Sequence, residues 1–186
     1  MSVTPNDILT LWFDESGPKK WFAQSDAFDA EIRDRFEDTA IDAALQATKF
    51  PAHPWEESAD SALALIIMLD QFPRNMYRGT KAMFAWDALA LAIAKRGVAQ
   101  NFDMKTDQSR RAFFYMPYMH SEIMADQDEC VRLIERGLDN ENTLHHARAH
   151  RKLIAQFGRF PHRNIVLGRE NTPQERSFLK SGGYTP

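Results

Sequence analysis

The chain has little of several features, and each shortage excludes a class of protein. Cys130 is the single cysteine among 186 residues, so no intrachain disulfide can form, as is typical of a reducing compartment. The longest apolar run, ALALIIML at residues 62–69, is far shorter than the ~20 residues that a membrane helix needs. The opening segment, MSVTPNDILTLWFDE, lacks the basic start and apolar run of a signal peptide. These shortages predict a cytoplasmic protein with no membrane insertion.

Excess positive charge and β-strand patterns are also absent. The net charge of −3 argues against nucleic acid as a partner, although a local basic strip runs through residues 148–163. No segment alternates apolar and polar residues for long, and no Asn-Gly or Asp-Gly dipeptide marks a hairpin. Hydrophobic residues make up 44% of the chain and charged residues 26%, which is ordinary for one globular domain. We therefore expect a single all-helical domain over residues 1–186.

Helical periodicity is what the sequence does have. Phe28, Ile32 and Phe36 recur every four residues, for example, as on one face of a helix. The pattern predicts about eight helices joined by mostly short loops. Such helices pack as antiparallel hairpins, in a tetratricopeptide-like stack or an irregular bundle. The 34-residue signature of a true tetratricopeptide repeat is missing.

Short polar side chains, prolines and glycines predict where these helices begin and end. The expected helix starts are Thr4 with Pro5, Ser25, Ser58, Thr106 and Thr172. The expected stops are Gly97 after a helix at about 81–96, Gly137 after about 122–136, and Gly158 after about 142–157. Pro117 is expected to kink or divide the helix that follows Thr106.

Two segments share a Phe-Pro-Arg-Asn skeleton and stand out as candidate sites. They are LDQFPRN at residues 69–75 and FGRFPHRN at residues 157–164, each following a predicted helix. Their polar residues are Arg74, Asn75, Arg159, His162, Arg163 and Asn164. One interpretation is that these cations cap helix ends and interact with the helix dipole. The other is an anion site, because the planar guanidinium of arginine suits carboxylate or phosphate.

A third candidate segment is FFYMPYMHSE at residues 113–122, where Tyr115 and three other aromatics surround Pro117. Core packing at a helix kink is one interpretation. The other is a general acid–base site, because a histidine such as His120 titrates near neutral pH and Glu122 or Asp70 could orient it.

Two further features need a partner or a ligand. His146 and His150 are four residues apart, as in zinc-binding helices, but the glutamate of that motif is missing and Arg148 lies between them. Solvated or core histidines are therefore the favoured interpretation, and nothing else in the chain predicts a metal or a cofactor. Asp70 ends an apolar run and needs a cation, which Arg74, Arg110 or Arg111 could supply.

These segments resemble a known bacterial family. LDQFPRNMYRGTKAMFAWD (residues 69–87), RRAFFYMPYMHSE (110–122) and HRKLIAQFGRFPHRNIVLGRENTPQE (150–175) are similar to the family called domain of unknown function 924. The resemblance covers nearly the whole chain and implies an all-helical, tetratricopeptide-like fold with no established activity. The matching positions are Asp70, Gln71, Phe72, Pro73, Arg74, Asn75, Arg78, Phe114, Tyr115, Pro117, His120, Ser121, Glu122, His150, Phe157, Arg159, Phe160, Pro161, His162, Arg163 and Asn164. Asn171 stands where the family leads us to expect serine, which should affect only the last helix cap.

Three hypotheses follow, and no reaction follows from the residues alone. The favoured one is a binding module for a small anionic ligand or acidic peptide. An enzyme acting on a phosphate- or carboxylate-bearing substrate is the second, and a helical adaptor for a protein partner, marked by an aromatic patch near Trp21-Phe22 or Trp55, is the third. The candidate catalytic residues are His120, Glu122 and His162. The candidate binding residues are Asp70, Arg74, Asn75, Tyr115, His150, Arg159, Arg163 and Asn164.

Overall fold

The structure is a computed structural model that describes residues 3–21 and 23–185, and its helices begin where short polar side chains cap them. The hydroxyls of Thr4, Ser25, Ser58 and Thr172 each accept a hydrogen bond from a backbone N–H of the first helical turn. These four predicted helix starts are confirmed. The prediction for Thr106 is wrong, because its hydroxyl donates to the carbonyl of residue 102 and the helix begins at Gln108.

The all-α fold class is confirmed, since the described residues contain no β-strand. The first half of the chain contains α1 (Pro5–Leu9), the π-helical segment Thr10–Ser16, α2 (Pro18–Trp21), α3 (Asp26–Lys49), α4 (Ala59–Asp70), α5 (Phe72–Met76) and α6 (Asp87–Ala99). The second half contains α7 (Phe102–Lys105), α8 (Gln108–His120), α9 (Met124–Gly137), α10 (Glu141–Phe157), α11 (Asn164–Leu167) and α12 (Pro173–Lys180). Single 3₁₀ turns lie at Pro54–Glu57, Lys81–Phe84 and Pro161–Arg163. The eight predicted helices correspond to the longer elements, and the short helices lie in what were expected to be loops.

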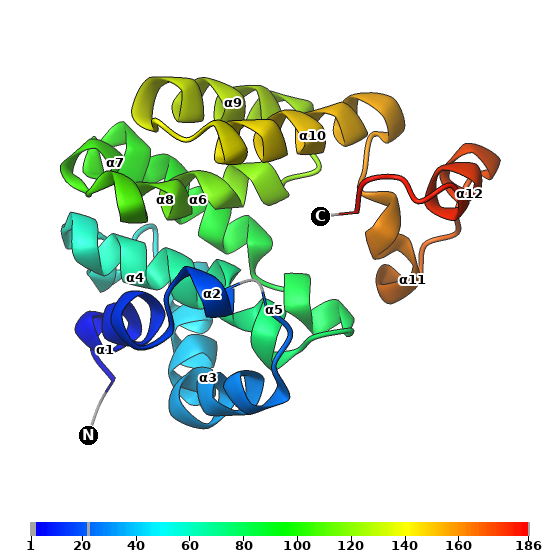
Figure 1. Ribbon diagram of the computed structural model, residues 1–186. Coiled ribbons are helices and arrows are strands. Elements are labelled where there is room, and N and C mark those ends of the chain that lie inside the picture. The colour runs from blue at the N-terminus through cyan, green and yellow to red at the C-terminus, as the bar shows by residue number, and fades with distance from the viewer. Residues whose placement is uncertain (1–2, 22, 186) are drawn as a thin grey trace.

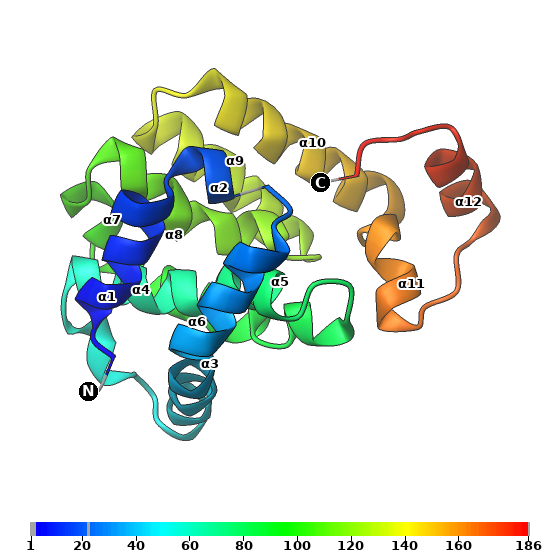
Figure 2. The same cartoon turned by 60° about the horizontal axis from the view of Figure 1, so that its bottom comes forward.

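Successive long helices pack on one another. α4 contacts α6, α6 contacts α8, α8 contacts α9, and α9 contacts α10, while α1 covers α4. The α8–α9 and α9–α10 connections are three residues each, so each pair must run antiparallel. Figures 1 and 2 show α9 and α10 side by side, with α11 and α12 at the end of the molecule away from α1. Hairpin packing is therefore observed, and the likeness to a tetratricopeptide stack stays a prediction.

The core lies around α4, where every residue from Ala62 to Asp70 is buried. Trp12, Phe36 and Phe72 pack against it as large, fully buried rings. A smaller apolar cluster beneath α12 is centred on Phe160. None of the described helices has both the length and the apolar character that crossing a membrane requires.

Two of the three predicted glycine stops pack closely against an aromatic side chain and have no left-handed backbone, and the stop predicted at Gly97 is wrong because α6 continues to Ala99. Gly158 does adopt φ +70° after α10, as predicted. Gly97 instead lies inside α6, where a Cβ atom would sit 2.9 Å from Cε1 of Phe114. Gly137 ends α9, but it faces the hydroxyl of Tyr115 and is not in the left-handed region. Pro117 does not divide α8, which continues to His120.

Candidate functional site

The C-terminal ends of α4 and α8 meet at a buried carboxylate–imidazole pair. Nδ1 of His120, the last residue of α8, lies 2.8 Å from Oδ1 of Asp70, the last residue of α4. Asp70 is 1% exposed, and it is held from two other directions. Gln71 donates to its other carboxylate oxygen, and Nη1 of Arg74 lies 3.4 Å from Oδ1. The predicted pairing of Asp70 with Arg74 is therefore present, with His120 as a further partner.

The charges around this pair determine its protonation. Burial would raise the pKa of Asp70, but His120 and Arg74 outweigh burial and hold it well below its ordinary value. Burial lowers the pKa of His120, and the nearby Arg74 cation lowers it further. Because the pKa values of both groups are lowered, Asp70 is ionised and His120 is neutral near pH 7. A neutral His120 donates its Nδ1 proton to Asp70, so Nε2 is its basic nitrogen.

Asp87 connects the two Phe-Pro segments. Its carboxylate accepts hydrogen bonds from Nη1 and Nη2 of Arg74 at 2.9 and 3.0 Å, and Nη1 of Arg163 lies 3.5 Å away. The Arg163 guanidinium lies between the rings of Phe84 and Phe160, at 4.6 and 4.4 Å from their centroids. Burial and the Arg74 charge lower the pKa of Arg163 to about 10. Asp87 begins α6, and no sequence pattern marked it as a site residue.

Glu122 does not orient His120 in this structure. It accepts the backbone N–H of Phe160 at 2.8 Å and pairs with Arg169 at 2.7 and 2.9 Å. It therefore joins the end of α8 to the Phe160 segment. His162 is half-buried, its buried Nδ1 atom has no hydrogen-bond partner, and burial lowers its pKa to about 4.

The other predicted binding residues are each held by another side chain away from this pair. The contacts are Asn75 to Asp29 (2.8 Å), Tyr115 to Asp103 (2.8 Å), Arg159 to Glu175 (2.7 and 2.8 Å) and Asn164 to Asn171 (2.7 Å). The expectation that Asn171 affects only a helix cap is thus wrong, because its side chain also fixes Asn164.

His120 also lines a cavity of about 1000 Å³ between α8, α10 and the N-terminal segment. Its apolar lining includes Phe13, Trp21 of α2, and Phe113, Met116 and Met119 of α8. The Trp21 and Phe113 rings meet edge to face at 4.9 Å between centroids. A cavity of this size with a few polar groups is typical of a small-molecule site.

The lining also includes two more histidines, of α10, and Tyr184 of the C-terminal segment. Nδ1 of His150 donates to the carbonyl of His146 at 2.8 Å, as its position on α10 allows. The hydroxyl of Tyr184 lies 2.9 Å from Nδ1 of His146 and 3.5 Å from Nδ1 of His150. Burial lowers the pKa of His150 to about 3, so its ring is neutral near pH 7. Tyr184 and His146 were not among the predicted site residues, because their meeting depends on the path of the C-terminus.

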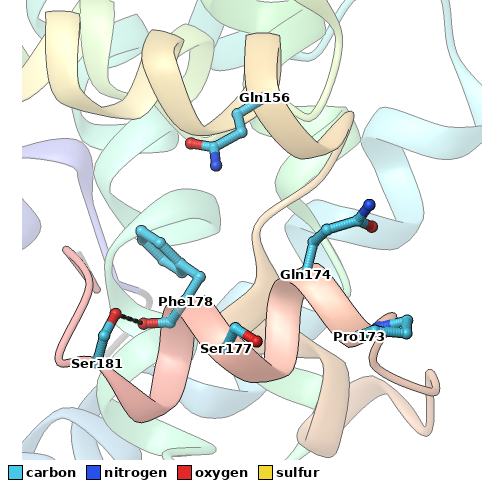
Figure 3. Close-up of a pocket in the computed structure, with 6 residues that line it drawn as sticks. All are labelled: Gln156, Pro173, Gln174, Ser177, Phe178 and Ser181. Atoms are coloured by element: carbon cyan, nitrogen blue, oxygen red, sulfur yellow. Dashed lines mark hydrogen bonds between the residues drawn. The ribbon is translucent and has the colours of Figure 1, made fainter.

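A second depression, of about 560 Å³, lies between α10 and α12 (Figure 3). Gln156 of α10 lies opposite Gln174, Ser177 and Phe178 of α12. None of its described lining residues is ionisable. The larger cavity, by contrast, is lined by ionisable side chains, including three histidines.

Within residues 3–21 and 23–185, no group of three or more His, Cys, Asp or Glu side chains is placed to hold a metal ion. His146 and His150 share one face of α10, but both Nδ1 atoms already have hydrogen-bond partners. The pair is better described as part of the cavity wall.

Comparison with known proteins places the chain in a family. Residues 8–183 match the family described as "Bacterial protein of unknown function (DUF924)", and the chain belongs to this family. A solved structure of a protein of unknown function from Agrobacterium tumefaciens is 42% identical, with a TM-score of 0.88. The similarity covers 96% of this chain and 97% of that one. The comparison with curated proteins gives no match. The resemblance seen in the sequence is confirmed, and the function of the protein is unknown.

Proposed function

We propose that the protein is an enzyme that binds a small organic molecule in the 1000 Å³ cavity and uses His120 as a general base. The observation that carries the proposal is the 2.8 Å contact between His120 Nδ1 and Asp70 Oδ1 in the cavity wall. A histidine held by a carboxylate through one ring nitrogen offers the other nitrogen in a fixed tautomer and orientation. We also propose a cytoplasmic location. The single cysteine of the protein, Cys130, is a buried free thiol, and burial raises its pKa to about 12.

In the proposed step, Nε2 of His120 takes a proton from a hydroxyl or amine group of the bound molecule, or from a water beside it. The O–H or N–H bond breaks, the electron pair stays on the oxygen or nitrogen, and an N–H bond forms on the imidazole. The Asp70 carboxylate accepts a hydrogen bond from Nδ1 and stabilises the imidazolium that results. The positive charge of Arg74 repels the imidazolium, and the ion pair between Arg74 and Asp87 weakens this repulsion.

This proposal differs from the anion-binding hypothesis in where the ligand lies. Arg74 and Arg163 share Asp87, and Arg159 pairs with Glu175, so a bound anion would compete with carboxylates already in place. The adaptor hypothesis has less support. Trp21 and Trp55 are half-buried against the core, and Phe22 lies outside the described residues.

The test compares wild-type protein with His120→Asn. The asparagine amide can still donate to Asp70 from near the Nδ1 position, but it lacks a basic nitrogen. Each protein is incubated with a bacterial metabolite extract, and the consumption of each compound is followed by mass spectrometry. We expect at least one compound to be consumed by the wild type, and roughly a hundredfold or more slowly by His120→Asn.

His145→Asn is the matched control, because His145 is an exposed histidine of α10 outside the cavity lining. It should consume the same compound at the wild-type rate. Equal rates for His120→Asn and wild type would exclude His120 as the base. If the wild type consumes nothing, the catalytic part of the proposal fails.

A further inference from the structure

We propose that the cavity takes a neutral or cationic molecule with a hydroxyl or amine group on an aromatic or aliphatic body, and that it discriminates against anions. This inference rests on the proposed function and adds the substrate class to it. It departs from the expectation of an anionic ligand. Three properties of the cavity lead to it: its hydrogen-bond acceptors, its charge and its apolar wall.

The first property is a pair of fixed acceptors. His120 donates its Nδ1 proton to Asp70, and His150 donates its Nδ1 proton to the carbonyl of His146, both at 2.8 Å. A neutral imidazole with hydrogen on Nδ1 has a lone pair on Nε2. Both histidines line the cavity, so both Nε2 atoms are acceptors for a ligand that brings its own donors. Hydroxyl and amine groups have such hydrogens, and a carboxylate or phosphate dianion does not.

The second property is the charge of the wall. Apart from the histidines, the described lining residues with an acidic or basic side chain are Arg110, Asp14 and Asp139. Arg110 lies 3.7 Å from Asp14 and stacks over the Phe13 ring at 4.7 Å. Arg74 and Arg163 do not line the cavity. The two carboxylates therefore outnumber the one guanidinium, and an anion would have to compete with Asp14 for Arg110.

His150 adds no positive charge near neutral pH. The phenol of Tyr184 and the ring of Phe160 pack edge-on against it, at 5.7 and 5.5 Å between centroids, and it is 6% exposed. Its surroundings keep the imidazole neutral, so it remains an acceptor over the physiological range.

The third property is the surface that would contact the body of the ligand. Trp21, Phe113, Met116 and Met119 line the cavity, and the Trp21 and Phe113 rings are in contact. Methionine thioethers adapt to irregular shapes and contact aromatic rings favourably, and the two aromatic side chains supply flat surface. A ligand with a ring or a branched chain at one end and a hydrogen-bond donor at the other would contact both these apolar side chains and the histidine acceptors.

The test uses four compounds with one ring and different polar groups: benzyl alcohol, benzylamine, benzoate and toluene. Protein with ¹³C-labelled methionine methyl groups is titrated with each, and binding is followed by NMR. Met116 and Met119 report on the cavity, while the buried core residues Met68 and Met76 and the exposed Met104 serve as internal controls. Substituting Met116→Leu and Met119→Leu assigns the two cavity signals.

We expect the shifts of the Met116 and Met119 signals to give dissociation constants for benzyl alcohol and benzylamine at least tenfold lower than that for benzoate. The three control signals should not move. His150→Asn keeps a donor for the His146 carbonyl but removes the Nε2 acceptor. This substitution should weaken the binding of benzyl alcohol several-fold and leave the binding of toluene unchanged.

Benzoate binding as tightly as benzyl alcohol would overturn the inference, and so would a lack of any shift at Met116 and Met119 with all four compounds. Neither result depends on turnover. His120→Asn in the metabolite experiment tests the base itself, so failure of the substrate class and failure of the catalytic role are distinguishable.

Discussion

Nδ1 of His120 lies 2.8 Å from Oδ1 of Asp70, and this contact joins the ends of two helices that are far apart in the sequence. The carboxylate is almost fully buried, while the imidazole is 16% exposed and lines the large cavity. The pair therefore has one side in the core and one side open to a ligand. A contact that only stabilised the fold would not need an imidazole that is open to the cavity.

The hydrogen-bond partners predict the tautomers of three histidines. His120 and His150 donate through Nδ1, to Asp70 and to the His146 carbonyl, so each should have hydrogen on Nδ1. His53 accepts the backbone N–H of residue 55 at its Nδ1 atom, so it should have hydrogen on Nε2. Long-range ¹⁵N–¹H NMR spectra at pH 7 distinguish the two forms by nitrogen chemical shift. An Nε2–H tautomer for His120 would remove the basis of the proposed base, and His53 is the internal reference.

Gly97→Ala tests the close packing of α6 on α8. Helix propensity alone predicts that alanine in a helix stabilises by about 1 kcal/mol relative to glycine. In the fold the new Cβ would lie 2.9 Å from Cε1 of Phe114, which is fully buried and cannot move freely. We therefore expect the opposite sign, a loss of roughly 1–3 kcal/mol from overpacking. Urea unfolding measures it, and a stabilised variant would contradict the packing described for Gly97.

This glycine illustrates what could be predicted from the sequence. Periodicity and capping residues are local signals, so the long helices and the caps at Ser25, Ser58 and Thr172 were predictable. A glycine near the end of a helical pattern was assigned to the helix stop, because a stop is its commonest local role. The facing Phe114 is a tertiary contact, which no local pattern of α6 contains.

The candidate site was predictable only in part, for the same reason. His120 and Asp70 were singled out because a histidine beyond a proline and an acid after an apolar run are unusual in themselves. Asp70 and Glu122 were both predicted as possible partners of His120, and no local pattern chose between them, since Glu122 was nearer in sequence and Asp70 had arginines to pair with. Tyr184 and Asp87 had no local signal at all, because a tyrosine near a terminus and an aspartate at a helix start are ordinary.

Arg163→Ala separates a structural arginine from an anion-binding one. The guanidinium lies between Phe84 and Phe160, and it is 7% exposed, so its loss removes two cation–π contacts and leaves a gap. We expect destabilisation of roughly 2–3 kcal/mol, seen as a lower melting temperature. Arg132→Ala is the control. Its i,i+3 pair with Glu129 is largely exposed, and its loss should cost no more than about 0.5 kcal/mol.

The same pair of proteins tests the anion hypothesis directly. Phosphate and citrate should leave the difference in melting temperature between wild type and Arg163→Ala unchanged at constant ionic strength. A stabilisation of the wild type by either anion that disappears in Arg163→Ala would instead place an anion site at Arg163.

Stability should fall as the pH decreases from 6.5 to 5, because of buried neutral histidines. Burial lowers the pKa of His150 to about 3 and that of His162 to about 4, from an ordinary value of 6.5. The unfolded chain therefore binds more protons than the folded protein between these values. The stability contributed by each neutral ring is fully present above pH 6.5 and is lost as the pH falls toward the folded-state pKa.

Carboxylates with a lowered pKa, such as Asp70 and Glu175, lose their contribution only below their unfolded values near pH 4. The range from pH 5 to 6.5 therefore isolates the histidines. Urea unfolding across this range should show the wild-type free energy of unfolding decreasing, with each buried histidine adding a slope that approaches about 1.4 kcal/mol per pH unit. His150→Asn should reduce the slope by up to that amount, whereas the exposed His145→Asn should not. An unchanged slope in His150→Asn would mean that His150 is protonated in the folded protein, and its Nε2 atom could not then be an acceptor in the cavity.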